Sequence, residues 1–227
     1  MPNHALIVHG GWHGHTPTES ANTFAPLLEA AGLKVTLRDN LDAYIDEDLM
    51  ADVSVVVPIW TMGEISKEQW KGLRQAIVNG CGVGGFHGGM IDAFRNNTDY
   101  QWMTGAQWVA HPGNAEMTYD VRIADATHPI TQGLGTFSLP HTEQYYCHHD
   151  PGNHVLCTTK INALPEGVTP EFNGLYPTGV THPYAWTRQF GKGRVFGACW
   201  GHTHKDFDIP EAKEIVRRGI LWAAGSL

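Results

Sequence analysis

Val53-Ser54-Val55-Val56-Val57-Pro58-Ile59 is the stretch of this sequence that decides its fold. An apolar run of this length is typical of a strand buried on both faces of a parallel sheet. Downstream, Ser66-Lys67-Glu68-Gln69 opens a helix that ends at Gly80, and its apolar residues recur at helical spacing. Residues 82–87 then form a glycine-rich strand. A strand, a helix and a second strand in this order predict one unit of a parallel α/β sheet.

The residues before this stretch repeat the same alternation. We predict a strand over residues 4–9, a helix over 18–31 that ends at Gly32, and a second strand over 33–37. Residues 41–50 are expected to form a short acidic helix. The order is that of a doubly wound sheet with right-handed crossovers.

The second half of the chain changes character. Residues 92–180 are rich in loops, with short alternating stretches at 117–123 and 154–158, and predict an antiparallel extension of the same domain. Regular structure returns with strands over 184–190 and 195–200, joined by a tight turn at 191–193, and with a closing helix over 210–224. We therefore expect a single domain over residues 1–227.

Composition excludes several classes of partner. The formal charge of −8, without a cluster of Lys and Arg, argues against nucleic acid and against anionic membranes. Residues 1–5 do not resemble a signal peptide, and no apolar segment approaches the ~20 residues of a membrane span. The four cysteines lack a CxxC spacing, which indicates free thiols and a cytoplasmic protein. The sequence allows a homo-oligomer.

Histidines gather at one edge of the predicted sheet. Ligands of open α/β sheets bind at the carboxyl ends of the strands, and six of the fourteen histidines follow such ends. These six are His9, His13, His15, His87, His202 and His204. Neutral imidazole serves as a metal ligand or as a general base near neutral pH. The pairs 13/15 and 202/204 would each share a face in an extended chain, which makes His13, His15 and His204 candidate ligands of a divalent metal such as zinc.

Gly85-Phe86-His87-Gly88-Gly89 has the small-residue frame of a nucleophile elbow, the sharp strand-to-helix turn that exposes one side chain. The exposed position holds His87 where a nucleophilic enzyme would have Ser or Cys. A covalent mechanism is therefore disfavoured, and we expect all four cysteines to be dispensable for activity.

Several motifs, taken in order, resemble one known family. They are the glycine-rich strand ending in His87, Gly105 with His111-Pro112, Thr142-Glu143-Gln144-Tyr145, Ala185-Trp186, Gly193-Arg194-Val195-Phe196, Gly201-His202, and Arg218-Gly219-Ile220-Leu221-Trp222-Ala223. The chain resembles the ThuA-like (trehalose utilisation) family across almost its whole length. The resemblance implies a flavodoxin-like sheet, similar to class I glutamine amidotransferases. His87 stands where an amidotransferase has its nucleophilic Cys, so an active amidotransferase is not expected. Thr142 departs from the Asp-Glu pair of the family.

The resemblance also implies carbohydrate metabolism, in partnership with an oxidoreductase that makes 3-keto sugars. An enzyme on keto-sugars or 3-keto-glycosides, working by elimination, hydrolysis or isomerisation, needs a base, an acid and a stabiliser for the enolate oxygen. The candidate catalytic residues are His87, His111, Glu143 and His202, which we expect to converge on one pocket, with Glu143 and His202 the two candidates for the base. The candidate sugar-contacting residues are Trp12, Trp60, Trp108 and Tyr145. A metal ion is one possible stabiliser; no nucleotide cofactor is expected.

Two other functions fit the same features. A catalytically inert sugar-binding or regulatory module on a degenerate amidotransferase scaffold would also lack the nucleophile, since fold does not guarantee chemistry. A metal-dependent hydrolase unrelated to sugars would be favoured if the two histidine pairs shared an ion.

Overall fold

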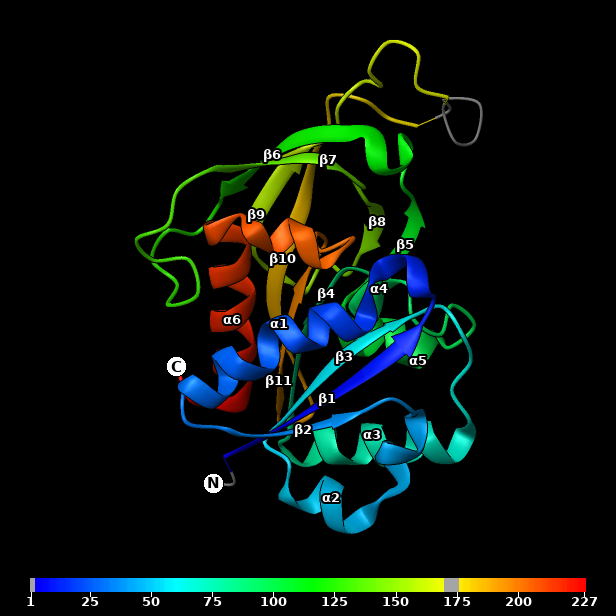
Figure 1. Ribbon diagram of the computed structural model, residues 1–227, viewed down its shortest axis with the longest axis vertical. Coiled ribbons are helices and arrows are strands. Elements are labelled where there is room, and N and C mark those ends of the chain that lie inside the picture. The colour runs from blue at the N-terminus through cyan, green and yellow to red at the C-terminus, as the bar shows by residue number, and fades with distance from the viewer. Residues whose placement is uncertain (1–2, 170–175) are drawn as a thin grey trace.

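A nine-stranded mixed sheet forms the centre of the protein (Figure 1). The computed structural model describes residues 3–169 and 176–227. Its strand order is β2-β1-β3-β4-β11-β10-β9-β6-β7. The first five strands in this order are parallel, and the last four continue the same sheet with antiparallel pairing.

The parallel half follows from the apolar runs of the sequence. Its central strand β3 pairs with β1 from Ala5 opposite Val55 to Gly11 opposite Thr61, and both strands are buried along most of their length. The strands of this half are β1 (His4–Gly11), β2 (Lys34–Arg38), β3 (Val55–Thr61), β4 (Gly82–Phe86) and β11 (Gly193–Ala198). The order 2-1-3-4, closed by β11, is that of flavodoxin-like sheets.

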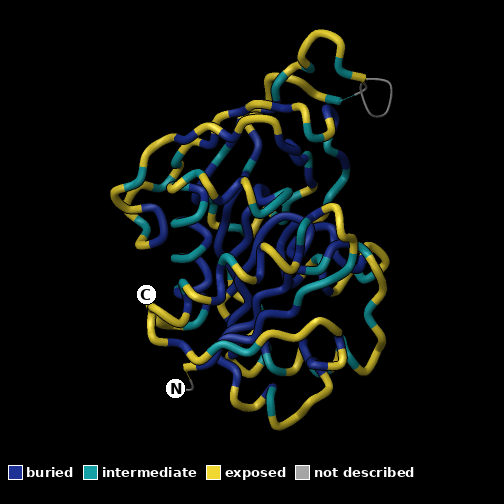
Figure 2. The backbone as a smooth tube through the Cα atoms, viewed as in Figure 1, coloured by how far each residue is buried: buried dark blue, intermediate teal, exposed yellow. Residues whose placement is uncertain are grey.

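Helices cover both faces of the parallel half. The connection from β1 to β2 runs across the sheet in the opposite direction to the connection from β3 to β4, so right-handed crossovers place their helices on opposite faces. These helices are α1 (Pro17–Ala30) and α3 (Lys67–Asn79); α6 (Pro210–Ala224) packs beside α1 (Figure 1). A capping box between Ser66 and Gln69 starts α3. Figure 2 shows the strands between these layers as the most continuous buried part of the chain.

The second half supplies the antiparallel extension. Its strands in the main sheet are β6 (Met117–Ile123), β7 (Phe137–Thr142), β9 (His154–Lys160) and β10 (Thr181–Phe190). A separate two-stranded sheet joins β5 (Ala106–Ala110) to β8 (Tyr146–His149), next to the short helices α4 (His87–Ile91) and α5 (Thr98–Thr104). The predicted antiparallel extension is thereby confirmed, although residues 170–175 of the range 92–180 lie outside the described residues.

Some sequence-based element boundaries differ from the structure. The helix predicted over residues 41–50 is divided into the 3₁₀ helix η2 (Leu41–Ile45) and α2 (Glu47–Asp52). Asp46 separates them because its extended backbone lets its carboxylate accept the amide hydrogen of Leu49, which caps α2. Strand β10 begins at Thr181, before the predicted start at Tyr184, and a bulge near Pro183 accommodates the proline. In the part of the chain that the structure covers, no helix is both long and apolar enough to span a bilayer.

Candidate active site

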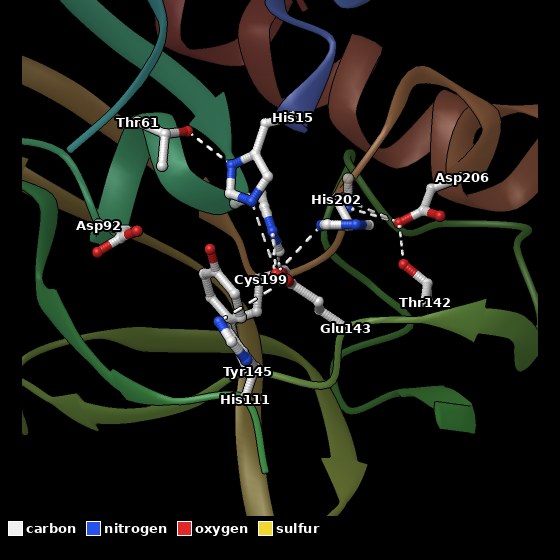
Figure 3. Close-up of polar contacts among 12 residues, drawn as sticks. His15, Thr61, Asp92, His111, Thr142, Glu143, Tyr145, Cys199, His202 and Asp206 are labelled. Carbon is white, nitrogen blue, oxygen red and sulfur yellow. Dashed lines mark hydrogen bonds and ion pairs between the residues drawn. The ribbon is translucent and has the colours of Figure 1, made fainter. Parts of the chain in front are cut away.

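Four strands of the parallel half deliver polar side chains to one edge of the sheet. The chain crosses to opposite faces after β1 and β3, so a crevice for ligands is expected at the carboxyl ends of these neighbouring strands. His15 follows β1 in the 3₁₀ helix η1 (His13–His15), Thr61 ends β3, and His87 follows β4. His202 lies four residues beyond the end of β11. In Figure 3, the side chains of His15 and His202 point toward Glu143, and that of Thr61 points toward His15.

Glu143 reaches this edge from the antiparallel extension, between β7 and β8. Its Oε2 lies 3.1 Å from His87 Nε2, 3.1 Å from His202 Nδ1 and 3.6 Å from His15 Nε2. Its second oxygen, Oε1, lies 3.7 Å from His111 Nε2. We refer to His15, His87, Glu143 and His202 as the His/Glu cluster; one donor atom from each lies within 4.8 Å of all the others.

Glu143 is ionised although it is buried. Burial raises the pKa of its carboxyl group, but the nearby imidazoles of His15, His202 and His87 oppose this effect, and the resulting pKa lies well below the usual range. The side chain is only 6% exposed. A carboxyl group with so low a pKa is negatively charged near neutral pH, among the imidazole rings.

His87 sits at a sharp turn between β4 and α4. Its φ of 47° is the left-handed conformation expected of an elbow residue, as the glycine frame of the sequence predicts. Nδ1 lies 2.9 Å from the carbonyl oxygen of Cys199, and the ring stacks on Tyr145 at 3.8 Å between centroids. Burial lowers the pKa of His87 to about 3, with partial opposition from Glu143, so the ring is neutral near pH 7.

Asp206 holds two parts of the site together, and no sequence pattern indicates this role. Its Oδ2 accepts hydrogen bonds from the amides of Gly201 and His202, at 3.1 and 3.0 Å, and from Thr142 Oγ1 at 2.9 Å. Thr142, the departure from the family's Asp-Glu pair, thus joins β7 to the loop after β11. Burial raises the pKa of Asp206, and these hydrogen bonds oppose the rise. Asp206 positions both Glu143 and His202 through the backbone.

A second buried acid, Asp92, lies beside the cluster (Figure 3). Arg95 holds it through two hydrogen bonds, and the Arg95 guanidinium also lies 4.1 Å above the ring centroid of Trp108. Burial raises the pKa of Asp92, while Arg95 lowers it. The burial of Asp92 and its place beside the cluster distinguish this pair from an ordinary surface ion pair.

The four predicted catalytic residues lie together, with His111 at the accessible side. His111 is 20% exposed and His202 is 14% exposed, whereas the side chain of His87 is almost fully buried. The geometry brings His87, His111, Glu143 and His202 to one carboxylate, as expected from the sequence. Their individual roles stay predictions.

The predicted sugar-contacting residues occupy different environments. Trp12 is 47% exposed and its ring meets that of His15 edge to face at 4.8 Å. Trp108 is half-buried, 5.5 Å from the His111 ring. Trp60 packs its ring against Gly10 and the hydrophobic core, and Tyr145 is fully buried beneath His87. Of this set, Trp12 therefore lies beside the cluster with an accessible surface, and Trp108 lies near the accessible side of the cluster at His111.

The predicted metal ligands are divided by the structure. His15 joins the cluster, but His13 and His204 lie outside it. The expectation of extended His-x-His pairs is wrong, because residues 13–15 form a 3₁₀ helix that leaves His13 exposed, and His204 begins the 3₁₀ helix η5 (His204–Asp208), where it contacts Thr16. His9 also lies apart, within β1 and 3.4 Å from Thr18. The partners of His15 are instead His87, His202 and Glu143.

Burial disfavours a nucleophilic role for the cysteines. All four are free and buried, and burial raises the pKa of Cys81 and of Cys157 to about 12. Thiols at such sites are inert because the thiolate is the reactive form. We expect each Cys→Ala variant to keep more than about half of the wild-type kcat, with losses confined to thermal stability. Complete inactivation of one variant that still shows the wild-type circular dichroism spectrum would contradict this.

Two cavities lie away from the His/Glu cluster. One of about 470 Å³ is lined by Gly63, Trp70, Asn97 and neighbouring residues, and another of about 580 Å³ lies between α2 and α3. Neither includes a residue of the His/Glu cluster. The chemistry of the side chains, and not the size of a cavity, identifies the site.

Comparison with known proteins agrees with this architecture. A ThuA-like protein from Bacteroides uniformis superposes with a TM-score of 0.78 at 15% identity, over 98% of this chain and 91% of that chain. One from Parabacteroides merdae gives 0.76 at 18% identity, over 99% and 90%. A GMP synthase component from Thermoplasma acidophilum gives 0.52 at 10% identity, over 98% and 94%. These likenesses confirm the class I glutamine amidotransferase-like fold.

No curated protein matches the sequence significantly. The model of the ThuA family, described as trehalose utilisation, matches residues 4–223. This match covers nearly the whole chain and confirms the resemblance drawn from its motifs. The chain belongs to the ThuA family.

Proposed function

We propose that this chain is an enzyme of sugar metabolism that acts on keto-sugars or 3-keto-glycosides by proton transfer at the His/Glu cluster. The family, described by trehalose utilisation, supports the substrate class. The observation that carries the proposal is a buried, ionised Glu143 approached by four imidazoles at the ligand edge of the sheet. A sugar-binding module would not need so many titratable groups at one point.

The chemistry follows from the carbonyl group. A keto group at C3 of a sugar acidifies the hydrogen at C2, so a base breaks the C2–H bond and leaves an enolate with its negative charge on O3. When the enolate collapses, C3=O re-forms, a C1=C2 double bond forms, and the substituent at C1 leaves with the C1–O electron pair and gains a proton from an acid. Reprotonation of the enolate at another position would give an isomer.

His111 is the group we assign to proton transfer with the substrate. It has the largest exposed fraction among the imidazoles around Glu143, and its Nε2 lies 3.7 Å from Oε1. The two candidates chosen from the sequence, Glu143 and His202, are less suited to this role. Three other imidazoles already approach Glu143, and His202 Nδ1 faces the carboxylate rather than solvent. These two residues would instead hold the cationic group that stabilises negative charge on O3, since an ionised carboxylate cannot stabilise an oxyanion itself.

Two aromatic residues beside the cluster would bind the sugar. Trp12 presents nearly half of its surface to solvent next to His15, and Trp108 lies between Arg95 and His111. Indole rings stack on the apolar faces of sugar rings.

We also propose that the protein works in the cytoplasm, which the four unpaired cysteines support.

Hydrogen exchange tests this proposal directly. In deuterated water, a 3-keto-glycoside incubated with the protein should gain deuterium at C2 in recovered substrate or product. His111→Ala should slow this exchange by about 10²–10⁴-fold, the usual contribution of a positioned acid or base. His148→Ala is the matched control, because His148 is exposed on β8, in the same two-stranded sheet that leads to His111, and it should leave exchange unchanged.

Two outcomes would overturn the proposal. Equal turnover of the unoxidised glycoside without exchange would identify a direct hydrolase. Binding of sugars with neither exchange nor turnover would identify the inert binding module.

A further inference from the structure

We infer that His15, His87, His202 and Glu143 bind a single divalent metal ion. The inference rests on the proposed function in one respect: the ion would supply the positive charge that the O3 oxygen of an enolate needs. It also replaces the ligand set expected from the sequence, because His13 and His204 lie elsewhere. The ligands proposed here come from the ends of β1, β4 and β11 and from the antiparallel extension.

The spacing of the donor atoms matches a coordination sphere. Two ligand atoms that are each about 2.0–2.2 Å from a tetrahedral ion are about 3.3–3.6 Å apart, and in an octahedral site about 3 Å apart. Glu143 Oε2 lies 3.1, 3.1 and 3.6 Å from the three imidazole nitrogens. The three rings also meet one another edge to face, with centroids 4.6–5.7 Å apart. Three nitrogens and one oxygen therefore lie within 4.8 Å of one another, which allows them to share one ion.

The hydrogen bond of His87 fixes which of its nitrogens faces the cluster. A backbone carbonyl only accepts, so Nδ1 must carry the proton that it donates to Cys199. In the neutral ring, Nε2 then presents a lone pair to Glu143 Oε2, 3.1 Å away, which also carries lone pairs. A cation between the two atoms removes the repulsion. Metal-binding histidines commonly donate their other N–H to a carbonyl in this way.

The remaining ligands are held by similar partners. His15 Nδ1 lies 2.7 Å from Thr61 Oγ1, which leaves Nε2 to face the cluster. His202 Nδ1 is buried and makes no aligned hydrogen bond, although Glu143 Oε2 is 3.1 Å away. Such an orientation is expected of a nitrogen that points at a shared ion and not at the carboxylate itself. Asp206 fixes the backbone at His202.

Charge and donor type indicate the class of ion. An imidazole that ligates a metal does so in its neutral form, so three such ligands and one carboxylate would carry a single negative charge in a largely buried site, which a divalent ion would compensate. Imidazole nitrogen suits zinc and the other late first-row metals, whereas calcium and magnesium prefer oxygen ligands. The accessible side of the cluster lies toward His111, so an ion held there would polarise a keto oxygen within reach of that imidazole.

A second group of possible ligands makes the test discriminating. Cys147, His149 and Cys199 also place one donor atom each within 4.8 Å of one another, and both ring nitrogens of His149 are buried. A metal bound there would have thiolate ligands. Cobalt(II) distinguishes the two groups, because thiolate ligation adds an intense near-ultraviolet charge-transfer band and histidine-carboxylate ligation does not.

The experiment is a cobalt(II) titration of full-length protein that has been stripped with a chelator. We expect one ion per chain, visible d–d bands without a thiolate band, and a raised unfolding temperature, since the ion binds the folded state. His87→Ala, His202→Ala and Glu143→Gln should each weaken binding by more than about 100-fold, beyond what loss of a merely orienting partner costs. His13→Ala, an exposed histidine two residues from His15, should bind cobalt like the wild type.

Each other result counts against the inference. A thiolate band, unchanged affinity in two folded cluster variants, or no binding by wild-type protein with a native circular dichroism spectrum would overturn it. Failure of the proposed function is distinguishable: cobalt bound as expected without C2 exchange leaves the metal site standing. Full exchange by the stripped protein leaves the sugar chemistry standing and removes the metal from it.

Discussion

Glu143→Gln is expected to lower kcat on a 3-keto-glycoside by about 10³-fold or more. Glutamine has nearly the same volume, so packing beside His87 and His202 is preserved. It carries no charge, however, and its amide group places hydrogens where the imidazole nitrogens converge on Oε2. The loss should appear in both kcat and kcat/KM, together with the loss of bound metal.

Glu116→Gln provides the matched control for this measurement. Glu116 is an exposed glutamate in the 3₁₀ helix η3 (Asn114–Glu116), close in sequence to His111, and the same change of charge there should leave kcat unaltered. A Glu143→Gln protein that folds and retains a tenth or more of the activity would show that the carboxylate charge is not used.

Gly89→Ala is expected to destabilise the fold by about 3 kcal/mol, the upper part of the range for an overpacked site. An added Cβ would lie 2.0 Å from the carbonyl oxygen of Pro58 and 2.8 Å from its carbonyl carbon. Both atoms belong to the main chain of the buried strand β3, which cannot move aside as a flexible side chain could. Thermal unfolding should shift down by about 6–12 °C for a domain of this size.

Gly135→Ala separates this clash from the general effect of replacing glycine. No atom lies within 4 Å of the Cβ position at Gly135, and its φ is not in the left-handed region. Its unfolding temperature should stay within about 2 °C of the wild type, since an unstrained surface change costs little. Equal stability of both variants would contradict the close approach of α4 to β3.

The parallel half of the fold could be predicted because its signals are local. The apolar run of β3 and the spacing of α3 each lie within one short window, and the helix over 210–224 ends where the sequence indicates. The sequence signals of the antiparallel extension are weaker. Strand β5 pairs with β8 across a long connection, and the alternation of polar and apolar residues in a strand does not show which other strand it pairs with.

The site was predicted in part for the same reason. His87 and His202 follow strands whose ends meet in any doubly wound sheet, so topology alone brings them together. Asp206 and Asp92 were missed because their roles depend on contacts with distant segments, such as the hydrogen bond to Thr142. His13 was wrongly predicted to join His15 as a metal ligand because the backbone was assumed to be extended, which would put both side chains on one face. The 3₁₀ helix over residues 13–15 instead points the two side chains in different directions.

The division of the cluster between the two halves of the sheet has a consequence for how the protein folds. The three histidines belong to the parallel half, whereas Glu143 arrives with the extension, whose strands pair over long sequence separations. Closing a long loop costs conformational entropy before the contact between its ends stabilises the protein. Pairings between residues far apart in the sequence therefore form slowly. In refolding, helical signal should therefore return first and the complete set of ligands last. Activity would then be a later reporter of the native state than secondary structure.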